Sequence, residues 1–139
     1  MKLNEYQQQL QICKMQIRTL EKLRKQQATI ESQIRHTEAD IEKYEQDLKN
    51  ARKKLNKLEG FSFVNLFRTW TGKQQELLEE RMDVIATKEL KLIEAQLMHE
   101  DLKDDLVDTI YKINAINEPY LVDQIKQLEN KIQIYYMAN

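Results

Sequence analysis

The first 118 residues contain no proline and only two glycines, Gly60 and Gly72, which frame a short segment. Glycine and proline are the residues that most often interrupt helices, so long helices are expected on either side of this segment. All three phenylalanines and the only tryptophan also fall inside it. We therefore divide the chain into a first arm (1–59), an aromatic bend (60–72), a second arm (73–118) and a C-terminal helix (119–139).

The first arm carries apolar side chains spaced alternately three and four residues apart, which is the heptad pattern of a coiled coil. Two runs of this pattern are out of frame by three residues near Leu23, a stammer that locally overwinds a coiled coil. Gln27 then falls on the apolar seam, where a polar residue usually sets the register or oligomer state. The runs consist of Leu3, Tyr6, Leu10, Cys13, Ile17 and Leu20, and of Ile30, Ile34, Thr37, Ile41, Tyr44, Leu48, Ala51, Leu55 and Leu58.

The apolar stripe of the second arm is broader and less regular than a strict heptad seam. A broad stripe can contact two neighbouring helices, which favours a bundle or a higher oligomer over a lone two-stranded hairpin. The stripe consists of Leu77, Leu78, Met82, Ile85, Leu92, Ile93, Leu97, Leu102, Leu106, Ile110 and Ile113, and is widened by Leu90, Ala95 and Met98.

Pro119 interrupts the helical pattern, because proline is tolerated in a first turn but not in the middle of a helix. We expect Asn117 to cap a last helix that either continues the second arm with a kink or folds back. That helix carries a stripe of its own at Leu121, Ile125, Leu128, Ile132 and Tyr135.

Charge is divided unevenly between the arms, with a balance of +4 over residues 1–59 and −6 over residues 73–139. If the aromatic bend reverses the chain, residue i lies opposite residue 132 − i, and basic residues of the first arm meet acidic residues of the second. Such pairs contribute little energy, but they select the pairing. The expected partners are Arg52, Lys53, Lys54 and Lys57 with Glu76, Glu79 and Glu80, and Arg18, Lys22, Arg24 and Lys25 with Asp104, Asp105 and Asp108.

The predicted fold is therefore all-α: a single domain formed by a long antiparallel coiled-coil hairpin that self-associates into an oligomer. The alternative is one continuous parallel dimer, which Gly60 and Gly72 disfavour because each costs roughly 1 kcal/mol inside a helix.

The aromatic bend is the candidate binding site. We expect it to form a short helix with Ser62 as its N-cap, whose apolar residues share one face. That face could close the hairpin as a buried plug, contact a larger protein or a second copy, or lie on an anionic membrane surface. The candidate partner-binding residues are Phe61, Phe63, Leu66, Phe67, Arg68 and Trp70.

Two resemblances bear on this segment. The spacing of Phe61-Ser62, Leu66-Phe67 and Gly72-Lys73 resembles an element of uncharacterised bacterial coiled-coil proteins, which implies a bacterial or phage origin and no particular activity. Trp70-Thr71-Gly72 is also similar to the Trp-x-Gly turn of helical hairpins exported by type VII secretion. Those chains usually carry a C-terminal Tyr-x-x-x-Asp/Glu signal. It is missing here, because the residue four positions after Tyr120 is Gln124 and the residue four positions after Tyr135 is Asn139.

Composition and motifs argue against catalysis, cofactors and a metal. Phosphate-binding loops, zinc-ligand spacings and nucleophile elbows are missing from the sequence. His36 and His99 fall near each other on the predicted pairing, but we interpret them as exposed helix residues. The net charge of −1 gives no support for nucleic-acid binding. With no signal peptide and a single cysteine, Cys13, we expect a cytoplasmic protein.

The function predicted from the sequence is a non-enzymatic interaction or scaffolding module. Its arms would self-associate and its aromatic bend would contact a larger protein. The alternatives are a peripheral membrane hairpin that uses the same bend and a type VII-secreted hairpin.

Overall fold

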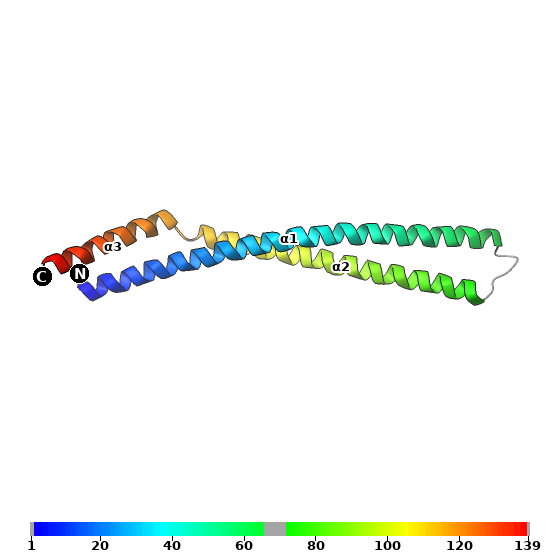
Figure 1. Ribbon diagram of the computed structural model, residues 1–139, viewed down its shortest axis with the longest axis horizontal. Coiled ribbons are helices and arrows are strands. Elements are labelled where there is room, and N and C mark those ends of the chain that lie inside the picture. The colour runs from blue at the N-terminus through cyan, green and yellow to red at the C-terminus, as the bar shows by residue number, and fades with distance from the viewer. Residues whose placement is uncertain (1, 66–71, 139) are drawn as a thin grey trace. The chain divides into compact units, whose positions relative to one another are not determined.

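The computed structural model describes residues 2–65 and 72–138, and the side chains of residues 2–57 and 75–138. Three helices make up nearly all of this part: α1 (Leu3–Asn65), α2 (Gly72–Asn114) and α3 (Glu118–Ala138) (Figure 1). The described residues contain no strand, so the all-α fold class is confirmed. The contacts divide the chain into two compact units, one of residues 1–32 with 104–139 and one of residues 33–103.

The first helix is longer than the sequence predicted. It passes through Gly60 and ends at Asn65. The prediction of a separate short helix with Ser62 as its N-cap is therefore wrong. A single glycine costs a helix only about 1 kcal/mol, which is too little to end one of this length. The side chains of Phe61 and Phe63 lie outside the described part, and Leu66, Phe67, Arg68 and Trp70 lie outside the described residues altogether.

The unit of residues 33–103 is an antiparallel pair formed by the second half of α1 and most of α2. Two ion pairs cross between the helices: Nε2 of His99 lies 3.1 Å from Oε1 of Glu38, and Nη2 of Arg52 lies 3.0 Å from Oε1 of Glu89. The α1 side of the seam follows the predicted spacing, with Thr37 and Leu48 buried and the intervening seam residues half-buried. The buried Thr37 hydroxyl donates to the carbonyl oxygen of Gln33 at 2.8 Å.

The predicted register between the arms is wrong. Arg52 contacts Glu89, nine residues beyond the expected Glu80. Arg24 contacts Glu118 rather than Asp108, which instead pairs with Lys112 along its own helix at 3.2 Å. The prediction failed because it placed the reversal at the centre of residues 60–72, whereas α1 continues to Asn65. Exposed charges contribute too little energy to fix the register against the packing of the seam.

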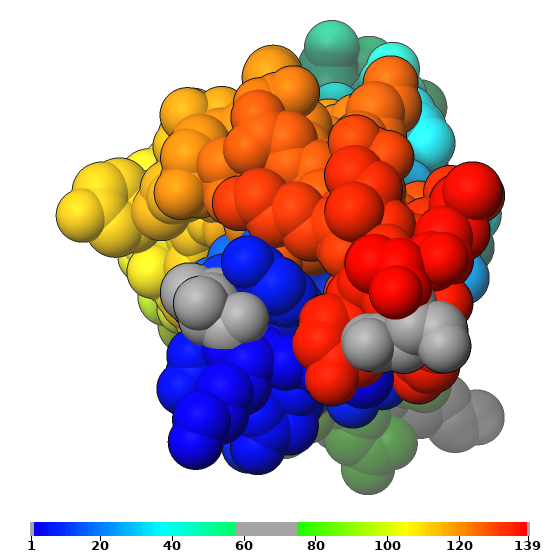
Figure 2. Space-filling model, turned by 90° about the vertical axis from the view of Figure 1, so that its left-hand side faces the viewer, coloured from blue at the N-terminus to red at the C-terminus, as the bar shows by residue number. Residues whose placement is uncertain are grey.

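The unit of residues 1–32 and 104–139 packs the first half of α1 against the end of α2 and against α3. Leu20, Leu121 and Leu128 are its most buried apolar residues, and Cys13 is half-buried in the same seam. Lys14 pairs with Glu129 at 3.8 Å, and the Lys131 ammonium lies 5.6 Å from the centre of the Tyr6 ring. Figure 2 shows the start of α1 in blue beside the end of α3 in red.

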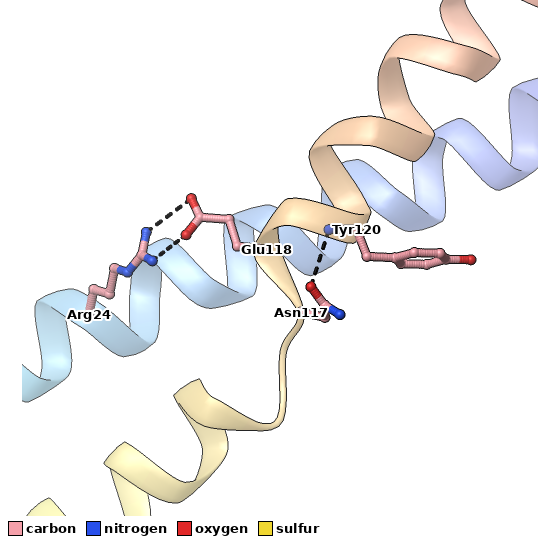
Figure 3. A network of polar contacts seen from close by, with 4 residues as sticks. All are labelled: Arg24, Asn117, Glu118 and Tyr120. Atoms are coloured by element: carbon pink, nitrogen blue, oxygen red, sulfur yellow. Dashed lines mark hydrogen bonds and ion pairs between the residues drawn. The ribbon is translucent and has the colours of Figure 1, made fainter.

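A three-residue connection separates α2 from α3, and it lies opposite the stammer of α1. Leu20 and Arg24 of α1 line the same recess as Ile113 and Asn117. As predicted, Asn117 caps α3: its side-chain oxygen accepts a hydrogen bond from the backbone N–H of Tyr120 at 3.2 Å (Figure 3). Because successive residues of α3 contact successively earlier residues of α1, α3 continues antiparallel to α1 rather than folding back.

Candidate functional site

The outward face of α2 in the unit of residues 33–103 carries an apolar surface. The α2 residues that face α1 recur at alternating spacings of three and four from Leu78 to Leu102. On this heptad frame, Ala86, Leu90, Ile93 and Leu97 occupy two of the three positions that point away from α1, which are normally polar in a two-stranded coiled coil. Leu90, Ile93 and Leu97 are 56%, 52% and 61% exposed.

These residues form one continuous strip. They recur four, three and four residues apart, and Met82, 53% exposed, extends the row by one turn. At about 100° per residue, all five fall within a sector of about 80° around α2, over a length of about 22 Å. We call this surface the α2 strip, defined as Met82, Ala86, Leu90, Ile93 and Leu97.

The corresponding outward positions of α1 in the same unit are polar. Five of the six outward residues between positions 35 and 53 are charged or amide side chains, and the sixth is an alanine. A helix pair that is complete by itself exposes polar residues on both outer faces. The difference between the two helices therefore marks α2 as the side whose apolar surface is not covered by any of the described residues. The α1 residues are Arg35, Ala39, Glu42, Gln46, Lys49 and Lys53, and all six are exposed.

Acidic residues close the α2 strip at both ends. Glu79 precedes the strip, Asp83 lies beside its first residue, Met82, and Glu100 follows its last residue, Leu97. Asp101 and Glu94 lie on one flank of the strip, and both are exposed. The basic residues nearest to the strip are Lys91, which projects about 100° away from Leu90, and Lys103, whose ammonium lies 3.7 Å from Oε1 of Glu100. The strip is therefore apolar in its middle and negative at its ends.

The opposite side of α2, which faces α1, contains polar residues that the sequence prediction did not include. Arg81, Lys88 and His99 occupy seam positions and are half-buried. Nε of Arg81 is buried and has no hydrogen-bond partner among the described residues. A recess of about 360 Å³ at this point is lined by Arg81 and Lys88 together with Asp47 and Lys54 of α1.

The polar pair at the start of α3 is the clearest electrostatic feature of the other unit. Both guanidinium Nη atoms of Arg24 donate to the carboxylate of Glu118, one of them over 3.3 Å. The hydrogen bond to Glu118 raises the pKa of Arg24, and the hydrogen bond from Arg24 lowers the pKa of Glu118. Both groups are exposed to solvent, so the pair orders α3 more than it stabilises the unit.

One of the two histidines that the sequence analysis interpreted as exposed is half-buried. His99 lies in the seam and contacts Glu38, whereas His36 is exposed. Across the described residues, no three histidine, cysteine, aspartate or glutamate side chains come together as a group able to hold a metal ion.

The broad stripe predicted for the second arm is in fact two faces. Leu78, Ile85, Leu92 and Leu102 point toward α1, whereas Leu90, Ile93 and Leu97 point outward. The sequence contains the signal that separates them, which is the unbroken three-and-four spacing from Leu78. That spacing passes through Arg81, Lys88 and His99, so a count of apolar residues alone does not detect it.

Comparisons with protein-family models, curated proteins and solved structures found no match. None of the helices, over the residues that the structure describes, has an apolar stretch long enough to cross a membrane.

Proposed function

We propose that this chain is a non-enzymatic protein-interaction module whose α2 strip binds a helix of another protein. One observation carries the proposal: α2 exposes large apolar side chains at outward heptad positions, whereas the outward positions of α1 in the same unit carry no large apolar side chain. An amphipathic helix that lies along such a surface is a common mode of recognition and uses contacts at the same three-and-four spacing.

The size of the α2 strip suits a reversible contact. Its four large side chains are each about half exposed, so covering the rest of each would contribute about 1 kcal/mol. The total of about 4 kcal/mol is comparable to the lower estimates of the free energy lost when two molecules associate. The strip alone would therefore give a weak complex, and a second contact would strengthen it.

The aromatic bend is the proposed second contact. Phe61, Phe63, Phe67 and Trp70 are the residues that we expect to supply it, with Leu66 and Arg68 in support. Self-association of the arms and a bacterial or phage origin remain parts of the same proposal. The alternative of a peripheral membrane protein fits the α2 strip less well, because Asp83 and Glu100 would meet the negative charge of an anionic bilayer.

Site-specific photo-crosslinking tests the proposal. A photoreactive amino acid is placed in the full chain at Leu90 or Leu97, and in control chains at Lys49 or Lys53, which point outward from α1. We expect crosslinks to another protein from the two α2 positions and none from the two α1 positions. Adding Leu97→Glu to the Leu90 crosslinking chain should strongly reduce its product, because burying a carboxylate without a partner is unfavourable.

Gln96→Glu is the matched control for Leu97→Glu. It adds the same side chain and the same charge one residue away, about 100° around α2 and off the strip. Circular dichroism should show unchanged helicity for both variants, because both positions are exposed. Equal crosslinking from α1 and α2, or an undiminished product after Leu97→Glu, would contradict the proposal.

A further inference from the structure

We propose that the partner of the α2 strip is an amphipathic helix with lysine or arginine at both ends of its own apolar stripe. This inference rests on the proposed function and adds the chemistry of the partner to it. The observation behind it is that acidic residues lie at both ends of the strip: Glu79 and Asp83 are at its start, on either side of Met82 in the sequence, and Glu100 is beyond its end. A bound helix that extends past the apolar residues must meet these carboxylates.

A second copy of α2 does not satisfy these charges. If two α2 strips packed antiparallel, with their apolar residues in contact, Asp83 of each copy would lie near Glu100 of the other. If they packed parallel, Asp83 would lie near Asp83 and Glu100 near Glu100. Either arrangement places like charges together at both ends of the interface, which disfavours association.

The outer face of α1 from a second copy does not satisfy the strip either. Over residues 35–53 it offers basic residues such as Lys49 and Lys53, but the only apolar residue among the six outward positions there is Ala39. If that face covered Leu90, Ile93 and Leu97, its polar side chains would lose their hydration without gaining hydrogen bonds. This cost opposes the gain from removing the apolar side chains from water. The occupant must combine an apolar stripe with basic ends, and neither the α2 strip nor the outward face of α1 over residues 35–53 supplies that combination.

The spacing of the acidic residues gives the spacing expected in the partner. Asp83 and Glu100 are separated by about 26 Å along α2, the rise of seventeen helical residues. A partner helix should therefore carry basic residues about five turns apart, with apolar residues at three-and-four spacing between them. Because the acidic groups are exposed, their attraction should be strong at low salt and largely screened at high salt.

Two synthetic helical peptides test this inference against the full chain. They share one leucine-based apolar stripe and differ only in the two end positions, which are lysine in one and glutamate in the other. Binding is followed by the fluorescence anisotropy of a labelled peptide. We expect the lysine-ended peptide to bind about tenfold more tightly in 50 mM salt, the equivalent of about 1.4 kcal/mol. In 500 mM salt the ratio should fall to about twofold or less.

Charge reversal on the protein provides the matched comparison. Asp83→Lys with Glu100→Lys should invert the preference, so that the glutamate-ended peptide binds more tightly. Glu42→Lys with Glu45→Lys changes the net charge by the same amount on exposed positions of α1 and should leave the preference unchanged. Circular dichroism of each variant verifies that it is folded before binding is measured.

The possible failures of the two proposals are distinguishable. Equal affinity for both peptides, together with loss of binding in Leu97→Glu, would overturn the basic-ended partner and leave the α2 strip as a binding surface. If neither peptide binds the full chain, both proposals are overturned. Light scattering then shows whether the chain is an oligomer that Leu97→Glu dissociates. If it is, the α2 strip is covered by a second copy, which explains why neither peptide binds.

Discussion

Glu118 combines three roles at the scale of a single residue. It is the first residue of α3, its carboxylate lies where the helix dipole favours negative charge, and it accepts two hydrogen bonds from Arg24. Asn117 before it caps the helix, and Pro119 after it occupies a position where no backbone donor is needed. Together these neighbours fix where α3 begins.

This arrangement predicts a pH dependence for the start of α3. Because Arg24 lowers the pKa of Glu118, the charged carboxylate favours the folded state above its ordinary pKa, and this contribution is lost as pH falls through the lowered value. Glu118→Gln should therefore melt at a lower temperature than the wild type near neutral pH, and the difference should vanish in strong acid. Thermal melts followed by circular dichroism at both pH values measure the difference.

The same pair gives a direct titration. In Arg24→Gln, the Glu118 carboxyl followed by NMR should titrate at a higher pH than in the wild type. Arg18→Gln removes the same charge about two turns earlier in α1 and should leave that titration in place. An unchanged Glu118 titration in Arg24→Gln would show that the two side chains are not paired in solution.

Single residues differ in how well the sequence predicted them. The Asn117 cap was predicted correctly because a cap depends on its immediate neighbours in the chain. The partner of Arg24 was predicted wrongly because it depends on the register of two helices about ninety residues apart in sequence. Exposed charges are poor indicators of such a register, since solvent screens them and many pairings differ by only a few tenths of a kcal/mol.

At the scale of one element, α2 serves two faces with different compositions. Its inner face includes Arg81, Lys88 and His99, whereas its outer face carries Leu90, Ile93 and Leu97. Polar residues in a seam usually reduce stability and restrict which pairings can form. We infer that α2 gives up some packing against α1 and retains apolar area for a contact on its other side.

Arg81 makes this cost measurable. Its buried Nε has no hydrogen-bond partner among the described residues, and a buried donor without a partner costs about 1–3 kcal/mol. Arg81→Leu should therefore increase the free energy of unfolding by about 1 kcal/mol, measured by urea denaturation with circular dichroism.

Arg35→Leu is the matched control for Arg81→Leu. It makes the same change on the exposed outer face of α1 and should alter the free energy of unfolding by less than about 0.5 kcal/mol. A decrease in stability for Arg81→Leu would mean that the guanidinium group has a partner in solution.

The elements themselves were largely predictable. The three-and-four spacing located the seam of α1 residue by residue, because burial of every third or fourth side chain follows from helix geometry alone. The end of α1 was not predictable, since Gly60 weakens a helix without ending it. The α2 strip was visible only as a broad stripe, because which of two apolar faces meets α1 depends on the partner helix and not on α2 alone.

At the scale of the whole molecule, the proposal links two separate regions of the chain. The α2 strip is a described surface, and the aromatic bend is a sequence prediction that lies outside the described residues. If both regions contact the partner, each contributes part of an affinity that neither would supply alone, and the loss of one should weaken binding without abolishing it.

Trp70, the only tryptophan, tests the role of the aromatic bend. If the bend is a partner contact, Trp70 in the purified chain should emit at the long wavelength of an exposed indole and be quenched by iodide. Light scattering on the same sample gives the oligomeric state. Blue-shifted, protected emission in a monomer would make the bend an internal plug, and the same emission in an oligomer would make it a self-association contact.

Cys13 gives the molecule a built-in reporter. It is the only cysteine, it is half-buried in the seam of α1, and the next residue, Lys14, pairs with Glu129 of α3. Because Cys13 is only half-buried, its rate of reaction with a thiol reagent should rise when α3 moves away from α1, and a change in that rate reports a change in how open this seam is. The native chain can therefore report its own local opening, and Asn117 and Glu118 variants can be compared on that scale without an engineered label.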